Sequence, residues 1–122
     1  MTFSRLKIHL ALVLMLACAP AWAADPPRAE IAEAERAIAA AEREQPRGQA
    51  GRYLDDARRQ LAEANALVER RKHRDALPVA QSAAATAELA AAQARLDNAR
   101  ETVDSRTARN ADLRRRLLVQ GN

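Results

Sequence analysis

Apolar residues recur at intervals of three and four from residue 28 onward, with charged residues between them, and this spacing predicts amphipathic helices. The first segment predicts a helix over about residues 28–44, after a short extended lead-in at 24–27 that contains two prolines. Pro46, Gly48 and Gly51 then interrupt the pattern and predict a reversal of the chain. The apolar positions of this first helix are Ile31, Ala34, Ile38 and Ala41.

A second helix is predicted over about residues 50–72, and Tyr53 near its start is expected to anchor packing rather than to contact a ligand. A basic connector follows, in which His73 is expected to be an exposed loop residue and Asp75 to cap the next helix. The apolar positions of the second helix are Leu54, Ala57, Leu61, Ala64 and Val68.

The third predicted helix covers about residues 76–118, because no glycine or proline interrupts it after Pro78 in the first turn. Its heptad pattern alternates small and large residues as far as Val103, and it continues with polar intrusions at Arg106 and Asn110. The second helix is about half as long, so we expect packing inside the chain up to Leu96 and a free end beyond about Val103. The candidate residues for pairing with a partner helix, called the leucine stripe below, are Leu89, Leu96, Val103, Leu113 and Leu117.

These patterns together predict an all-α fold. We expect an antiparallel helical hairpin or three-helix arrangement with a long, partly projecting C-terminal helix, similar to coiled-coil or tetratricopeptide architectures. The whole of residues 28–122 is expected to form a single helical domain.

The first 23 residues carry a different pattern, in which Arg5 and Lys7 precede the apolar run 10–19 and Ala21-Trp22-Ala23 follows it. This is typical of a secretory signal peptide with an A-x-A cleavage site. The run is about half the ~20 apolar residues that a membrane-spanning helix needs. We therefore expect a mature chain that begins at Ala24 or Asp25 and lies in the periplasm.

Cys18 leaves an alternative open, because residues 14–18 resemble a bacterial lipobox in which the cysteine becomes the lipidated first residue. Lipidation would make the protein an outer-membrane lipoprotein. We favour ordinary cleavage after Ala23, since Met15 departs from the usual lipobox leucine and the A-x-A site follows the apolar run closely.

Composition after cleavage favours thin, extended packing. Residues 24–122 contain 26 alanines, no cysteine and a single aromatic residue, Tyr53. No disulfide can compensate for a small core, and alanine buries little surface. Loss of Arg5 and Lys7 leaves 18 basic and 16 acidic residues, a net charge of +2, which is not the charge expected of a nucleic-acid binder.

A cluster of cations stands near the C-terminus at Arg114, Arg115 and Arg116. These arginines are candidates for contact with an anionic membrane or cell-wall surface. The simpler interpretation, which we favour, is that cations in the last turns of a helix complement its dipole.

Candidate chemistry is sparse in the mature chain. Ser82 and Ser105 have no recognisable histidine base, and His73 has no second histidine with which to hold a metal. Asp55 and Asp56 are adjacent on a helix and point about 100° apart, so their carboxylates do not converge. We expect no enzymatic activity, no cofactor and no metal site.

The stretch from Ala29 to Ala99, including the segment 53–61, resembles a family of short secreted bacterial proteins with an Ala/Glu/Arg-rich helical domain of unknown function. Members sometimes occur beside OmpA-type peptidoglycan-binding domains. The resemblance implies an envelope protein whose partner is another envelope protein, for example an OmpA-like one, or a second copy of itself. The stretch from Leu54 to Ala94 is also similar to a tetratricopeptide hairpin, although no second repeat is visible.

Three functions are consistent with these features. The first is a structural or adaptor module of the envelope that acts through protein–protein contacts. We favour it because the third helix extends beyond the end of the second helix, which is the partner available within the chain. The second is a periplasmic holdase chaperone, which is disfavoured by the scarcity of methionine and aromatic residues. The third is a binder of anionic membrane or cell-wall surfaces through the terminal arginines.

Overall fold

The structure, a computed structural model, describes residues 26–121. Three α-helices fill nearly all of this range, which contains no strand: α2 (Arg28–Arg43), α3 (Gly48–Glu69) and α4 (His73–Gln120). The predicted all-α fold with a long C-terminal helix is confirmed. The predicted signal peptide, its cleavage site and Cys18 lie outside the described residues.

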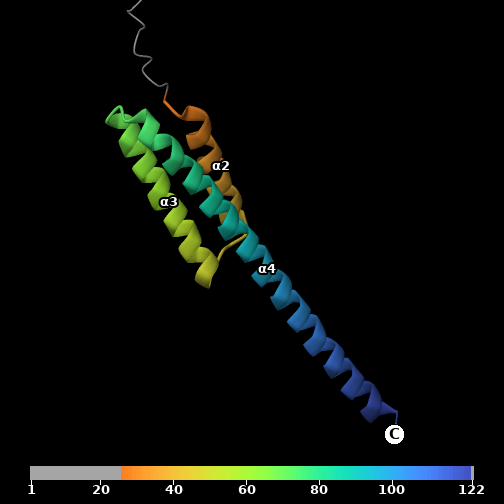
Figure 1. The fold of residues 1–122 in the computed structure, drawn as a ribbon. Helices are drawn as coiled ribbons and strands as arrows, with labels where there is room; N and C mark the ends of the chain where they lie inside the picture. The colour runs from red at the N-terminus through yellow and green to blue at the C-terminus, as the bar shows by residue number, and fades with distance from the viewer. Residues whose placement is uncertain (1–25, 122) are drawn as a thin grey trace, which may run out of the picture.

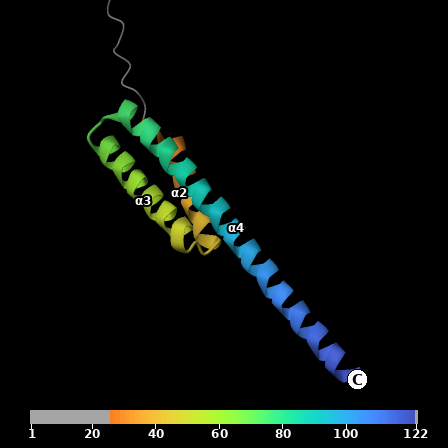
Figure 2. The same ribbon diagram turned by 60° about the horizontal axis from the view of Figure 1, so that its bottom comes forward.

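The three helices form a short bundle from which half of α4 projects (Figure 1). Helix α3 runs antiparallel to α2, and α4 turns back beside both and continues well beyond them, as Figure 2 also shows. Both α2 and α3 pack more extensively against α4 than against each other. Helix α4 is therefore the central element, and at ~1.5 Å per residue its 48 residues extend for about 70 Å.

Alanine dominates the core of the bundle. Of the 16 buried hydrophobic residues within 26–121, 14 are alanine, and Ile38 and Leu54 are the exceptions. Tyr53 and Leu61 pack partly buried against this core, which confirms the packing role expected of Tyr53. Eight of these alanines form one face of α4, called the alanine face below: Ala76, Ala80, Ala83, Ala84, Ala87, Ala90, Ala91 and Ala94.

The prediction that the leucine stripe packs inside the chain up to Leu96 is wrong. Leu89 is 49% exposed and Leu96 is 44% exposed, whereas Ala87 and Ala90, on either side of Leu89 in the sequence, are fully buried. Residues two apart on a helix point roughly 200° apart, so the leucines lie opposite the alanine face. The physical reason is that two helices pack on α4 here. Adjacent rows of small side chains on α4 leave room for both α2 and α3. The leucines, one per heptad, therefore lie on the opposite face of α4.

The helix ends differ from the predicted bounds by up to three residues. Helix α4 begins at His73, so Pro78 lies in its second turn, and Asp75 lies in its first turn without capping it. His73 is the first residue of α4 and is half-buried, not an exposed loop residue. Its ring Nδ1 is buried and has no hydrogen-bond partner among the described residues.

Helix α3 ends three residues earlier than predicted because the chain closes a Schellman motif. The backbone N–H of Lys72 donates to Leu67 O at 2.9 Å, and that of Arg71 donates to Val68 O at 2.9 Å. This geometry places Arg71 at a φ of 59°, in the left-handed region that favours glycine.

Replacing Arg71 by glycine should stabilise the protein, because glycine adopts this φ without steric cost. We expect Arg71→Gly to raise the free energy of unfolding by about 0.5–1 kcal/mol, seen as a midpoint of thermal unfolding higher by roughly 2–8 °C. The neighbouring Arg70 has a φ of −80°, and Arg70→Gly is the control, which should not stabilise. Equal effects of the two changes would contradict this account of the turn.

Enlarging a residue on the alanine face should destabilise the bundle, because it forces two closely packed helices apart. We expect Ala87→Leu to lower the free energy of unfolding by about 1–3 kcal/mol, measured by chemical denaturation. Ala92 lies on the opposite, exposed side of α4, and Ala92→Leu should change stability by less than about 0.5 kcal/mol. An unchanged free energy of unfolding in Ala87→Leu would show that the helices are not closely packed there.

Candidate interaction surface on the projecting helix

The face of α4 that packs in the bundle becomes charged beyond Ala94. One heptad row runs from Ala83 and Ala90 to Asp97 and Asp104, and a second reaches Glu101 seven residues after Ala94. Burying these carboxylates against another apolar helix would cost more than it gains. The bundle therefore ends where the alanine face ends.

A polar junction closes the bundle at this point. Glu44, which follows α2, accepts a hydrogen bond from Arg95 Nε on its carboxylate at 2.7 Å and one from Asn98 Nδ2 on its carbonyl oxygen at 3.1 Å. A free end was predicted beyond about Val103, and the structure ends the packing inside the chain earlier, at Asn98. Residues 99–120, called the stalk below, are all exposed apart from the half-buried Asp112.

The leucine stripe runs along the stalk on the side opposite the continuation of the alanine face. Its stalk members are widely exposed, with Val103 at 61%, Leu113 at 56% and Leu117 at 69%. The large residues follow a seven-residue repeat in which Asn110 takes one place: Leu89, Leu96, Val103, Asn110 and Leu117. A second row, offset from the first by three or four residues, consists of Ala85, Ala92, Ala99, Arg106 and Leu113.

The two rows together have the spacing of a coiled-coil seam. The stripe begins beside the bundle, where Leu89 lines a groove between α3 and α4 together with Tyr53, Gln60 and Thr86. It therefore forms one line from the bundle to the end of the stalk.

Charges on the stalk are separated by face. The acidic residues Glu101, Asp104 and Asp112 all lie away from the stripe, as does Asp97 just before the stalk. Most arginines of the stalk lie in or beside the stripe. The three arginines predicted to contact an anionic surface do not share one face: by heptad position Arg114 and Arg116 flank the stripe, whereas Arg115 lies on the outer face. The exposed pairs of Arg115 and Arg116 with Asp112, at 3.8 and 2.8 Å, contribute little to stability.

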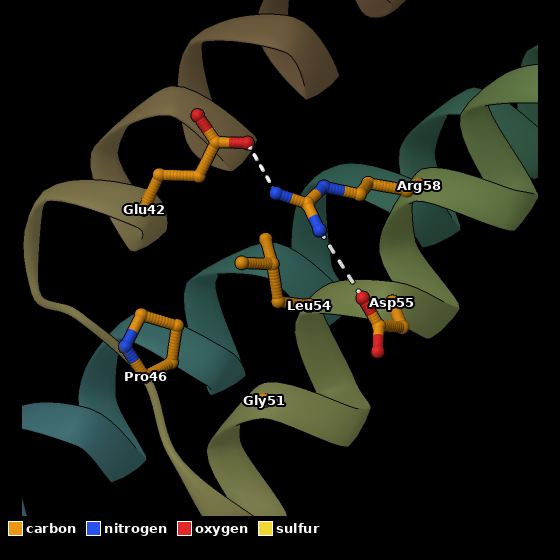
Figure 3. A pocket seen from close by; sticks show the side chains of 6 residues that line it. All are labelled: Glu42, Pro46, Gly51, Leu54, Asp55 and Arg58. Carbon is orange, nitrogen blue, oxygen red and sulfur yellow. Dashed lines mark hydrogen bonds and ion pairs between the residues drawn. The ribbon is translucent and has the colours of Figure 1, made fainter.

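A second polar cluster ties α2 to α3 at the edge of a shallow groove (Figure 3). Arg58 donates to the carboxylates of Glu42 at 2.6 Å and Asp55 at 3.1 Å. The hydrogen bond with Glu42 is the main cause that raises the pKa of the Arg58 guanidinium above its ordinary value. A raised pKa keeps the guanidinium charged at neutral pH, so the cationic side of this tie is present there.

The acidic pair singled out from the sequence does not converge on a site. Asp55 pairs with Arg58 and Asp56 with Arg59, each three residues further along α3. Within residues 26–121 no group of three or more histidine, cysteine, aspartate or glutamate side chains is placed to hold a metal ion. Over the same range, no helix combines the length and apolar character needed to cross a membrane.

Comparisons of the chain with protein-family models, with curated proteins and with solved structures return no match. The resemblance to the Ala/Glu/Arg-rich envelope family therefore stays a prediction.

The stalk should be far less protected from hydrogen exchange than the bundle, because a helix of this length without tertiary packing is only marginally stable in water. We expect backbone amides in residues 99–120 to exchange at least about 100-fold faster than those in residues 80–94. Hydrogen exchange followed by mass spectrometry measures both segments in one sample. Equal protection would mean that the stalk already has a packing partner in the purified protein.

Proposed function

We propose that this protein is a non-enzymatic component of the bacterial envelope, acting in the periplasm as a structural or adaptor module through protein–protein contacts. The observation that carries the proposal is the leucine stripe, a line of exposed large apolar residues on a helix whose other face already packs in the bundle. Fully burying one leucine contributes roughly 1.5–3 kcal/mol, so covering the stripe offers a partner substantial binding energy.

The division of α4 into two parts suits an adaptor. The buried core of the bundle consists mainly of alanine and contains no residue of the stripe. The stalk then presents the stripe at a distance from the bundle, so that a partner can cover it without displacing α2 or α3. A long helix with an unpaired heptad seam is the usual form of one half of a helix–helix interface.

A holdase function would call for a different surface. Proteins that bind many unfolded clients rely on adaptable methionine or aromatic side chains. Residues 85–122 contain neither, and their apolar residues follow a regular heptad spacing. This composition favours one partner with a matching spacing over many unrelated clients.

Site-specific photo-crosslinking in intact cells tests the proposal. A benzophenone amino acid at Val103 or Leu113 should give a discrete crosslinked product with a single envelope protein, whereas the same group at Glu101 or Ala108, on the outer face, should not. Products from both faces, or a smear of many proteins from the stripe, would contradict an adaptor with a defined helical interface.

The proposed location is tested separately by the intact mass of the protein isolated from the envelope. We expect a mass that begins at Ala24 or Asp25 and a location in the periplasm. An acylated Cys18 at the N-terminus would instead establish the lipoprotein alternative and place the module on a membrane leaflet. Retention of residues 1–23 would contradict both locations.

A further inference from the structure

We propose that the leucine stripe docks a helix of a different protein, one that carries acidic residues on both sides of its own apolar seam. This inference rests on the proposed function and narrows it to one kind of partner. It follows from the width of the stripe, the charges beside it and the pattern of small and large residues within it.

The stripe is narrow. From Leu89 to Leu113 each heptad contributes one large residue and, as far as Ala99, one alanine, with Arg100, Thr102 and Thr107 immediately beside them. Leu118 and Val119 widen the exposed apolar surface only in the last turn of α4. A helix that lies in a membrane surface needs a broader apolar face, about 100° or more in width, whereas a two-position stripe is typical of a coiled-coil seam. The geometry therefore favours a helix over a lipid surface as the occupant.

The charges beside the stripe are of one sign along the stalk. In a coiled coil, the two positions that flank the seam contact the partner helix. From Arg95 to Arg116 no acidic residue occupies a seam or flanking position, and the four acidic residues of this segment all lie on the outer face. The arginines in or beside the seam are Arg95, Arg100, Arg106, Arg109, Arg114 and Arg116.

This distribution disfavours a second copy of the chain. In a parallel pair, Arg109 of one copy would face Arg114 of the other, and Arg106 would meet its equivalent in the seam. In an antiparallel pair, each arginine-bearing flank would face the same flank of the other copy. Acidic flanks on a different helix convert these repulsions into attractions, which is how charged flanks select partners.

The seam itself also specifies the partner. The alanine row at Ala85, Ala92 and Ala99 leaves space that large apolar side chains on the partner would fill. Asn110 replaces a large apolar residue in the other row, and a polar residue at such a position fixes register by requiring a polar neighbour. An acidic helix with bulky seam residues and one polar layer fits these positions.

Binding of two designed peptides to the full protein tests the proposal. Both are helical peptides of five heptads with leucine in the seam, and one carries glutamate and the other lysine at all flanking positions. We expect the glutamate peptide to bind at least about 30-fold more tightly than the lysine peptide at 0.1 M salt, measured by calorimetry. The difference should shrink as salt rises, because the flanking charges are exposed.

Charge variants with a matched control locate the effect. Arg100→Glu combined with Arg109→Glu lowers the charge in and beside the seam from +6 to +2 (four arginines minus two glutamates) and should shrink the preference for the glutamate peptide severalfold. The control combines Arg115→Glu, Ala108→Glu and Ala111→Glu on the outer face, which changes net charge by the same amount and should leave the preference intact. Circular dichroism of each variant confirms that it remains helical.

Other outcomes would overturn the inference. Equal or absent binding of the two peptides would remove the acidic-helix partner. A stable dimer by light scattering would assign the stripe to a second copy, and stripe-dependent binding to phosphatidylglycerol vesicles without a peptide preference would assign it to a membrane. Crosslinks from Val103 or Leu113 but not from the outer face would still support the adaptor function in any of these cases. Failure of the acidic-helix partner is therefore distinguishable from failure of the adaptor function.

Discussion

The structure depends on the close packing of two helices against one face of α4. Leucines along that face would hold α2 and α3 apart, whereas alanine in adjacent rows leaves room for both. Each of these small residues buries little apolar surface, so the bundle is stabilised by many close contacts along the length of the helices rather than by a few large buried side chains. Ile38 and Leu54, the two larger side chains of the buried cluster, lie on α2 and α3.

This packing has a direct consequence for the opposite face of α4. Since two neighbouring helices already cover the alanine face, the leucines that lie roughly 200° away stay in water, beginning at Leu89 beside the bundle. The alanine rows then give way to Asp97, Glu101 and Asp104, so the bundle ends while the leucine pattern continues. One helix thus carries two apolar faces, of which the first packs in the bundle and the second is exposed.

Much of this could be predicted from sequence, because the three-and-four spacing identifies the helices and the length of the third helix predicts its projection. The side of α4 that faces the core could not. The alanine face and the leucine stripe follow the same helical period, and hydrophobicity alone predicts that the leucines, rather than the alanines, face the core. The number of neighbouring helices decides the matter, and that is a tertiary property. The early end of α3 was missed because Arg71, rather than glycine, takes the left-handed position.

A cysteine-accessibility scan along residues 83–96 tests this account most directly. Single cysteines are placed at each position in turn, in a chain with Cys18 replaced by serine, and their rates of reaction with a thiol reagent are compared. We expect slow labelling at 83, 87, 90 and 94 and fast labelling at 85, 89, 92 and 96 in the protein alone. Fast labelling at the first four positions and slow labelling at the other four would show that the leucines form the core. The leucine stripe would then not be an exposed surface.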